Sequence, residues 1–341
     1  MNFRVPTVDD PLRVLALGAG VQSSYLFLAS CEGELPYLDC AIFADTGNEP
    51  ATVYRHLDWL ETVGAKAAIP IIRCSVGDLK QDVIDFRQDR VSRDGKRWAS
   101  VPFYVKNKDG SRGQINRQCT PTYKIEPMDR VIREQLLGLK RGQRSQPVPL
   151  IEQWIGISSD EGQRCSFPGV FRTIKTHGVD LFGNKIEVAK RKVWGPLRWK
   201  SHVYPLCGWR FTADRKVYDV GYLPRQFDRQ ACQEWLARKY PGRKIPRSAC
   251  KICPYRSNEE WRRMRDEEPA DFAEAVQFDR DIRIADHHGQ SKRKMLVGLP
   301  FVHDSLVPLD MVDLDVDDGK RGAGCGIARG IQGSFAGMCG V

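Results

Sequence analysis

Three short apolar runs, each leading into a helical pattern, constrain the fold of this chain more than any other feature. The first run covers residues 13–17, stops at a glycine-rich turn over 18–20 and precedes a helical pattern over 22–29. The order repeats twice, with strands expected over 40–44 and 68–73 and helices over 51–63 and 78–88; a fourth buried strand is expected over 151–157. Apolar strands alternating with amphipathic helices indicate βαβ units. We therefore expect an α/β fold with a doubly wound, mostly parallel, Rossmann-like sheet.

The rest of the chain differs in pattern from this alternating part. We expect an α/β domain over residues 1–206, a helical, cysteine-bearing C-terminal region over 207–318 and a glycine-rich, flexible tail over 319–341. Two basic stretches of low periodicity, near 91–118 and 168–202, interrupt the first domain, and the former is expected to form a loop or hairpin. Further helices are expected over 124–137, 228–239, 257–266 and 269–284.

Charge is concentrated in the same two parts of the chain. The formal net charge is +10, and residues 87–144 contain 15 basic and 6 acidic side chains while residues 164–200 contain 9 and 2. Such clusters fit a polyanion, either a nucleotide or a nucleic acid, although a solvated basic face would show the same composition. No apolar run approaches the roughly 20 residues of a membrane helix, and the first residues lack the pattern of an export signal. We therefore expect a cytoplasmic protein without a membrane partner.

The first glycine turn has the composition of an anion site. Small residues allow backbone N–H groups to approach phosphate oxygens, the serines add hydroxyl donors and the helix N-terminus supplies a favourable dipole. The residues concerned are Gly18, Ala19, Gly20, Gln22, Ser23 and Ser24. The turn is neither a Walker A loop nor a dinucleotide fingerprint, so a turn that only packs helix against strand remains an alternative. Asp45, Thr46 and Gly47 follow the second strand, where open α/β sheets bind ligands, and would line the same crevice.

Cysteine spacing suggests a metal or thiol site. Among eleven cysteines, Cys250 and Cys253 form a CxxC pair, Cys232 lies 18 residues before Cys250, and Cys119 begins a helix near Lys124. These four could bind an iron–sulfur cluster or zinc, could include a redox pair, or could share their spacing by coincidence. Cys165 and Cys207 are alternative ligands. Cys325 and Cys339, in the tail, are a possible sulfur relay or exposed thiols without a role.

An acidic pair and an arginine follow the expected strand over 151–157. Asp160 and Glu161 could bind magnesium, and Arg164 could neutralise a phosphate or sulfate. An acidic helix start with an exposed arginine would have the same sequence.

Several of these motifs together resemble the PP-loop ATP pyrophosphatases, and within them the phosphoadenosine phosphosulfate reductase-like family in its phage and actinobacterial form. The matching segments are residues 18–24, 43–49, 119–124, 156–161 and 248–255. The cysteine pattern is similar to that of the iron–sulfur PP-loop enzyme of DNA phosphorothioation. The resemblance implies an adenine nucleotide alpha hydrolase-like fold and a 4Fe–4S cluster, or alternatively zinc, on Cys119, Cys232, Cys250 and Cys253. Gln22 stands where the family has an aspartate, so Asp45 or Asp160 would have to hold magnesium.

The resemblance also implies an activity. ATP would bind at residues 18–24 and 45–47, with Asp45, Cys119, Lys124, Asp160 and Arg164 as catalytic residues. A nucleic acid, DNA or tRNA, would be adenylated and then receive sulfur from the cluster or a cysteine persulfide, supplied by a cysteine desulfurase or thioredoxin-like donor. The alternatives are a sulfonucleotide reductase that releases sulfite, and a non-catalytic module that binds a nucleotide or nucleic acid.

Overall fold

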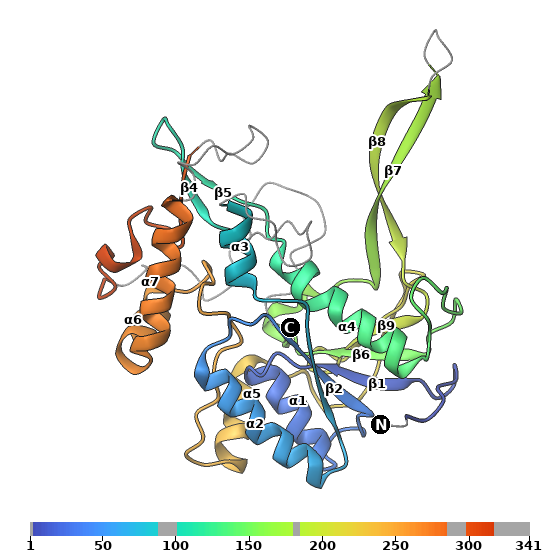
Figure 1. Cartoon of the computed structure of the whole chain (residues 1–341). Coiled ribbons are helices and arrows are strands. Elements are labelled where there is room, and N and C mark those ends of the chain that lie inside the picture. The colour runs from blue at the N-terminus through green and yellow to red at the C-terminus, as the bar shows by residue number, and fades with distance from the viewer. Residues whose placement is uncertain (1–2, 88–100, 180–184, 285–297, 317–341) are drawn as a thin grey trace.

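A seven-stranded, mostly parallel sheet forms the centre of the molecule (Figure 1). The computed structural model describes residues 3–87, 101–179, 185–284 and 298–316, with side chains described outside 171–192 and 86–87. The strands lie in the order β11-β10-β9-β6-β1-β2-β3. Their bounds are β1 Leu12–Ala16, β2 Cys40–Asp45, β3 Ile71–Ser75, β6 Ile151–Ile155, β9 Lys200–Tyr204, β10 Trp209–Phe211 and β11 Val217–Asp219.

The pairing of these strands confirms the expected α/β class. β1 pairs in parallel with both β2 and β6, β2 with β3, and β6 with β9, whereas β10 pairs antiparallel with β9 and β11. The four strands expected from the sequence are β1, β2, β3 and β6. The chain passes outward from β1 to β3 and then returns to place β6 on the other side of β1. This reversal makes the β1–β6 boundary the topological switch point, where open α/β sheets bind ligands.

Helices cover both faces of the sheet because the central strands bury side chains in both directions. Leu15 and Leu17 pack under α1 (Val21–Cys31), α2 (Ala51–Lys66) and α5 (Arg229–Lys239). Leu12 and Val14 pack on the opposite face under α4 (Glu126–Val131) and the π-helical turn η2 (Ile132–Leu136) that follows it. Another π-helical turn, η1 (Pro121–Ile125), precedes α4. The two-sided burial explains why these strands read as continuous apolar runs.

A third hydrophobic cluster lies apart from both faces of the sheet. Trp261 and Phe278 belong to it, together with Tyr123 of η1. It joins α3 (Leu79–Arg87), α6 (Asn258–Glu267) and α7 (Pro269–Ile284) to the three-stranded sheet of β12 (Leu299–Phe301), β4 (Tyr104–Lys106) and β5 (Arg112–Gln114), and to the turn η5 (Leu309–Met311). The cluster brings the C-terminal helices over the segment that contains Cys119.

The first basic stretch contains a hairpin, as expected, whereas the second is more regular than its sequence suggests. The first contains the β4–β5 hairpin, and its residues 88–100 lie outside the described part of the chain. The second contains β7 (Gly169–Val179) and β8 (Lys185–Pro196), which pair antiparallel in a long ribbon that projects from the body (Figure 1). The central sheet continues beyond residue 206 into β10 and β11, and the tail over 319–341 is not described.

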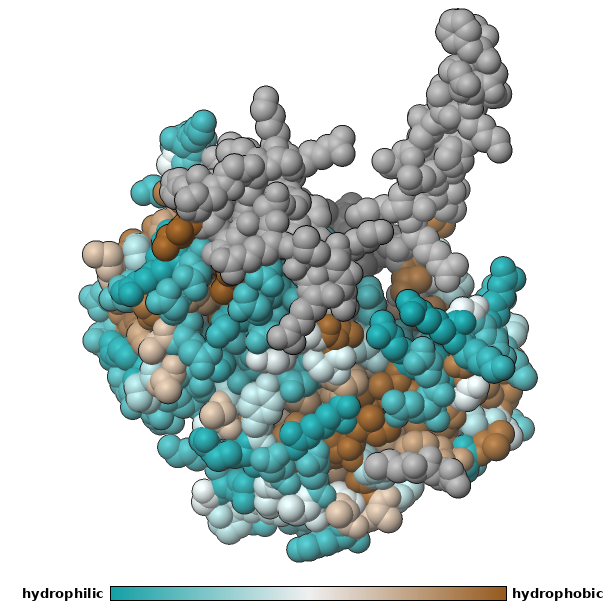
Figure 2. All heavy atoms as spheres, in the orientation of Figure 1, coloured by the Kyte–Doolittle hydropathy of each residue, from teal (hydrophilic) through white to brown (hydrophobic). Residues whose placement is uncertain are grey.

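Hydrophilic residues cover most of the face shown in Figure 2, and hydrophobic residues gather near the central sheet. Among the described residues, no helix combines the length and the apolar character needed to cross a membrane.

Candidate functional site

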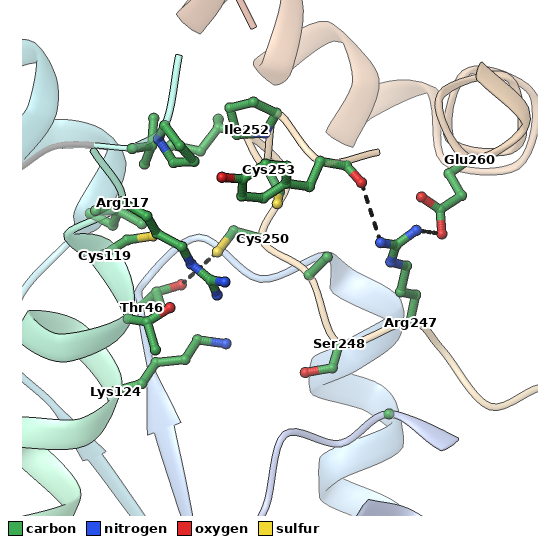
Figure 3. Close-up of a pocket in the computed structure, with 18 of the residues that line it drawn as sticks. Thr46, Arg117, Cys119, Lys124, Arg247, Ser248, Cys250, Ile252, Cys253 and Glu260 are labelled. Atoms are coloured by element: carbon green, nitrogen blue, oxygen red, sulfur yellow. Dashed lines mark hydrogen bonds and ion pairs between the residues drawn. The ribbon is translucent and has the colours of Figure 1, made fainter. Parts of the chain in front are cut away.

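A pocket of about 200 Å³ lies at the carboxyl ends of β1, β2 and β6. The turn after β1 contributes residues 20–23, the turn after β2 contributes Thr46, and the 3-10 turn η3 (Ser159–Arg164) after β6 contributes Glu161 and Arg164. Residues of the 117–124 and 247–255 segments form the opposite wall (Figure 3). The pocket therefore occupies the switch point of the sheet.

The turn after β1 exposes the first N–H groups of α1 to this pocket. Ala19 has a left-handed backbone with φ 55°, and the first helical hydrogen bond runs from the Ser24 N–H to the Gly20 carbonyl at 2.9 Å. A Cβ at Gly20 would lie 2.9 Å from Ser248 Cβ, and one at Gly156 would lie 3.0 Å from Ser23 N. Glycine at both positions is needed for this close approach of β6, α1 and the 248 segment. The N–H groups before the first helical bond have no intrahelical acceptor, so they are available to an anion.

Gln22, in the first turn of α1, is held by three neighbours. Its amide nitrogen donates to Ser158 Oγ at 3.3 Å and to Glu161 Oε2 at 3.4 Å, and its oxygen accepts from the Arg229 guanidinium at 3.2 Å. A neutral amide can donate and accept in this way, whereas a carboxylate beside Glu161 would repel it. Gln22 therefore ties the helix N-terminus to η3 and α5.

The turn after β2 presents one of its predicted residues to the pocket. Asp45 is turned away: its carboxylate accepts from the Gly47 N–H and the Tyr54 hydroxyl, both at 2.8 Å. Thr46 lines the pocket, and its hydroxyl contacts Glu49 Oε1 at 3.1 Å and the Cys250 sulfur at 3.8 Å. Asp45 shapes the turn that positions Thr46.

Three of the four predicted cysteine ligands line the same pocket. Cys119, Cys250 and Cys253 approach it from η1 and from the CxxC turn, in which the Cys253 N–H donates to the Cys250 carbonyl at 3.1 Å (Figure 3). The Lys251 N–H donates to the Asn48 carbonyl at 2.9 Å, which fastens this turn to the β2–α2 connection. Burial raises the pKa of the Cys250 and Cys119 thiols. The positive charge of Lys124 partly offsets this rise at Cys250, and that of Arg117 partly offsets it at Cys119.

The fourth predicted ligand lies elsewhere. Cys232 is fully buried in the hydrophobic cluster beneath α1 and does not line the pocket. Burial raises its pKa to about 12, and the carboxylates of Asp228 and Asp160 add to this effect.

Among the described residues, five basic side chains line the pocket, and the two carboxylates that line it are paired with arginine. The basic residues are Arg117, Lys124, Arg164, Arg229 and Arg247. Arg164 pairs with Glu161 at 2.6 Å, and Arg247 pairs with Glu260. Burial lowers the pKa of Arg247, and the charges of Arg256 and Arg229 act in the same direction. An anionic ligand would relieve this mutual repulsion of cations.

Helix capping places Arg247. Ser257 caps α6, and Glu260 completes a capping box by accepting from the Ser257 N–H at 3.1 Å. The same glutamate pairs with Arg247, whose guanidinium also donates to the Tyr255 carbonyl at 3.3 Å. The local signal that begins α6 thus also orients a cation of the pocket.

The structure brings together only some of the predicted site residues. Those that line the pocket are Gly20, Gln22, Ser23, Thr46, Cys119, Lys124, Arg164, Cys250 and Cys253, whereas Gly18, Ala19, Ser24, Asp45, Gly47, Asp160 and Cys232 do not. Ser24 contacts His56 Nε2 at 2.9 Å, and exposed Asp160 accepts from the Arg229 N–H at 3.2 Å. Cys325 and Cys339 lie outside the described residues. Sequence reasoning missed Arg229, Arg247, Ser248 and Glu260; only the closeness of Arg247 and Ser248 to the CxxC pair could have indicated them.

The described lining of the pocket presents three thiols and two carboxylates that are paired with arginine. Within the described ranges, no three His, Cys, Asp or Glu side chains are grouped closely enough to bind one metal ion. In a 4Fe–4S cluster each thiolate binds a different iron, so three thiols around one pocket fit such a cluster without meeting at one point. Magnesium fits less well, because the two carboxylates of the described lining are paired with arginine.

No protein-family model matches the chain, and no curated protein matches it. Its function must therefore be inferred from the chemistry of this pocket.

Proposed function

We propose that this chain is a PP-loop-type enzyme that uses an adenine nucleotide to transfer sulfur to a nucleic acid. One observation carries the proposal: a helix N-terminus, five basic side chains and three cysteines line a single pocket at the switch point of a parallel sheet. Phosphate-binding groups and sulfur nucleophiles are the two requirements of such a reaction, and here they lie within one cavity.

The nucleotide phosphates would bind against the first turn of α1. Ser23 and the backbone N–H groups of residues 21–23 would donate to phosphate oxygens, and Lys124 and Arg229 would neutralise their charge. An oxygen of the acceptor would attack the α-phosphate, which forms the adenylate and releases pyrophosphate. Without a free carboxylate in the described lining, charge compensation depends on these cations rather than on a carboxylate-bound magnesium ion.

Cys119, Cys250 and Cys253 would hold an iron–sulfur cluster, leaving one iron without a protein thiolate. When bound, the cluster would supply a site for a sulfur atom that is not part of the protein. The positive charge of Lys124 lowers the pKa of Cys250, so it would stabilise the negative charge of this thiolate. Displacement of AMP by sulfur would then complete the transfer.

The projecting ribbon supports a nucleic-acid acceptor. β7 and β8 pair over eleven register positions, and residues 164–200, which include both strands, contain 9 basic and 2 acidic residues. A two-stranded antiparallel ribbon fits the major groove of duplex DNA, and basic residues bind the phosphate backbone.

A second candidate is a sulfonucleotide reductase. Gln22 and the two arginine-paired carboxylates favour it, because reduction of a sulfonucleotide needs no pyrophosphate release and hence no magnesium-assisted leaving group. In this case a cysteine of the pocket would attack the sulfate sulfur, break its bond to the phosphate oxygen and release the nucleotide, leaving an S-sulfocysteine. A thiol donor would then displace sulfite and form a disulfide with the cysteine.

Product analysis under anaerobic reducing conditions separates the candidates. Sulfur transfer predicts pyrophosphate release from ATP that depends on added DNA or tRNA, and incorporation of labelled sulfur into the nucleic acid. The reductase predicts sulfite from phosphoadenylyl sulfate and no pyrophosphate from ATP. Nucleotide binding without either product would favour the non-catalytic module and contradict both enzymes.

Matched glycine variants test the nucleotide pocket. Gly20→Ala brings a methyl group to 2.9 Å from Ser248 Cβ, so the affinity for ATP should fall about tenfold or more. Gly113→Ala is the control, because its methyl group meets no atom closer than 3.5 Å and lies in the β4–β5 hairpin. Equal ATP affinity of the two variants by calorimetry would argue against binding at α1.

Iron and acid-labile sulfide analysis tests the sulfur side of the pocket. Anaerobically purified protein should contain about four irons with matching sulfide, and separate replacement of Cys119, Cys250 or Cys253 by Ala should abolish this content. Cys232→Ala is the matched control and should retain the iron. Loss of iron on replacing Cys232 would contradict the three-cysteine site.

A further inference from the structure

Two cysteines outside the pocket lie within reach of one another. The Cys165 sulfur is 4.0 Å from the Cys207 sulfur, and the Cys207 thiol also donates to the Ile157 carbonyl at 3.3 Å. Cys207 is buried and Cys165 is partly exposed, and both pack in the hydrophobic cluster on the α4 face of the sheet. Neither residue lines the pocket.

The backbone around the two cysteines is already fastened together. Ser166, next to Cys165, donates its N–H to the Tyr204 hydroxyl at 2.9 Å and accepts from this hydroxyl through its carbonyl at 2.9 Å. The Cys207 N–H donates to the Tyr204 carbonyl at 3.0 Å. Tyr204 therefore links the two chain segments, and a disulfide requires the sulfurs to move from 4.0 Å to about 2.05 Å apart.

We infer that Cys165 and Cys207 form a redox-active dithiol that closes reversibly to a disulfide joining η3 to the β9–β10 connection. With a small-molecule disulfide such as oxidised glutathione as the oxidant, two protein thiols lose two protons and two electrons to form one S–S bond. The oxidant accepts them, its S–S bond breaks, and two glutathione thiols are released. The thiolate of Cys165, the more exposed of the two, attacks oxidised glutathione, forms a mixed disulfide and releases one glutathione thiol; Cys207 then attacks the Cys165 sulfur and releases the second.

This bond would act on the pocket through η3. Cys165 directly follows Arg164, which lines the pocket and pairs with Glu161 at 2.6 Å. Glu161 in turn accepts from Gln22 at 3.4 Å, so the end of η3 is connected to the N-terminus of α1. Oxidation therefore fixes the segment that orients one cation and one carboxylate of the pocket.

Peptide mapping tests the inference directly. After equilibration with oxidised glutathione and alkylation, trypsin should release peptides 165–172 and 201–210 as one cross-linked species, two hydrogen masses lighter than their sum. Dithiothreitol should separate them. Cys207→Ser and Cys165→Ser should each abolish the species, and Cys31→Ser should retain it, because Cys31 lies at the end of α1 outside both cysteine groups.

Thermal unfolding provides a second readout. A disulfide formed without strain restrains the unfolded chain, so the oxidised protein should have a higher Tm than the reduced protein, and Cys207→Ser should remove this difference. Absence of the cross-linked species at the most oxidising ratio, or a lower Tm on oxidation, would overturn the inference. The assay involves neither nucleotide nor iron, so its failure is distinct from failure of the proposed function.

Discussion

Cys250 and Cys232 are both buried thiols of the C-terminal half and each belongs to a hydrophobic cluster, yet only Cys250 also lines the pocket. Cys250 lies 3.8 Å from the Thr46 hydroxyl and interacts with the charges of Glu49 and Lys124. Cys232 belongs to the cluster of Tyr25 and Trp235 under α1. Burial raises the pKa of both thiols, so burial alone does not distinguish them.

The two sites differ in their free energy when no ligand is bound. A hydrocarbon cluster is stable by itself, because close-packed apolar side chains need no partner. A pocket with buried cations and thiols costs free energy unless its charges are paired or a ligand binds. The second kind of site is therefore the better candidate for function.

The largest expected effect concerns the buried charge beside Cys250. Burial, the largest single contribution, lowers the pKa of Lys124, but the Glu49 carboxylate at 3.5 Å and the Cys250 and Cys119 thiols together outweigh burial, so the pKa is raised. Both side chains are nearly inaccessible, with exposed fractions of 12% and 2%. Lys124→Met should therefore lower the free energy of unfolding by about 3–5 kcal/mol, because Glu49 becomes an unpaired buried charge; urea denaturation measures this change.

The control for this variant removes the unpaired charge of Glu49. Glu49→Gln in the Lys124→Met background should recover most of the lost stability, since the neutral amide can still accept from Thr46, which now donates to Glu49 at 3.1 Å. A single Lys124→Met variant that costs less than about 1 kcal/mol would mean that the pair is solvated, as surface pairs are.

A smaller effect on the free energy of unfolding is expected at low pH from His56, a buried histidine of α2 that packs near α1. Burial lowers the pKa of His56 from 6.5 to about 4, and the charge of Arg243 acts in the same direction. The unfolded chain therefore binds a proton between pH 6.5 and 4 that the folded chain does not. Because only the unfolded chain takes up this proton, the free energy of unfolding should fall by about 3 kcal/mol as the pH drops through this range. His56 should cause no further loss below it.

His56→Gln should flatten this part of the pH profile in urea denaturation. Buried His202, whose pKa is lowered to about 3, should leave a remaining slope of the same sign in the variant. Identical slopes in both proteins would show that His56 is protonated in the folded state.

Positions of most central elements could be predicted because their signals are local. The strand expected over 13–17 is β1, Leu12–Ala16, and the helix expected over 228–239 is α5, Arg229–Lys239, capped by Asp228. The β7–β8 ribbon could not be predicted, because its pairing joins Gly169 to Pro196 and the strands show no strict alternation of apolar residues.

For the site, the sequence located the loops but not the directions of their side chains. Gly20 and Thr46 follow parallel strands, and the carboxyl ends of such strands meet at one edge. Asp45 is directed into its own turn by the Gly47 N–H, a result of backbone geometry that spacing does not contain. Arg229 and Arg247 reach the pocket from distant segments, which depends on how the third hydrophobic cluster and α5 pack.

The smallest expected effect on the free energy of unfolding comes from replacing the two cysteines one at a time. Cys232→Ala removes a sulfur from a close-packed cluster and should lower the free energy of unfolding by about 1 kcal/mol, without altering iron content or ATP affinity. Cys250→Ala removes the same atoms from the wall of the pocket, and here the iron should be lost. Denaturant midpoints and iron analysis on the same two preparations give both quantities. A loss of iron with Cys232→Ala and its retention with Cys250→Ala would reverse the comparison, and would assign the functional thiol to the core beneath α1.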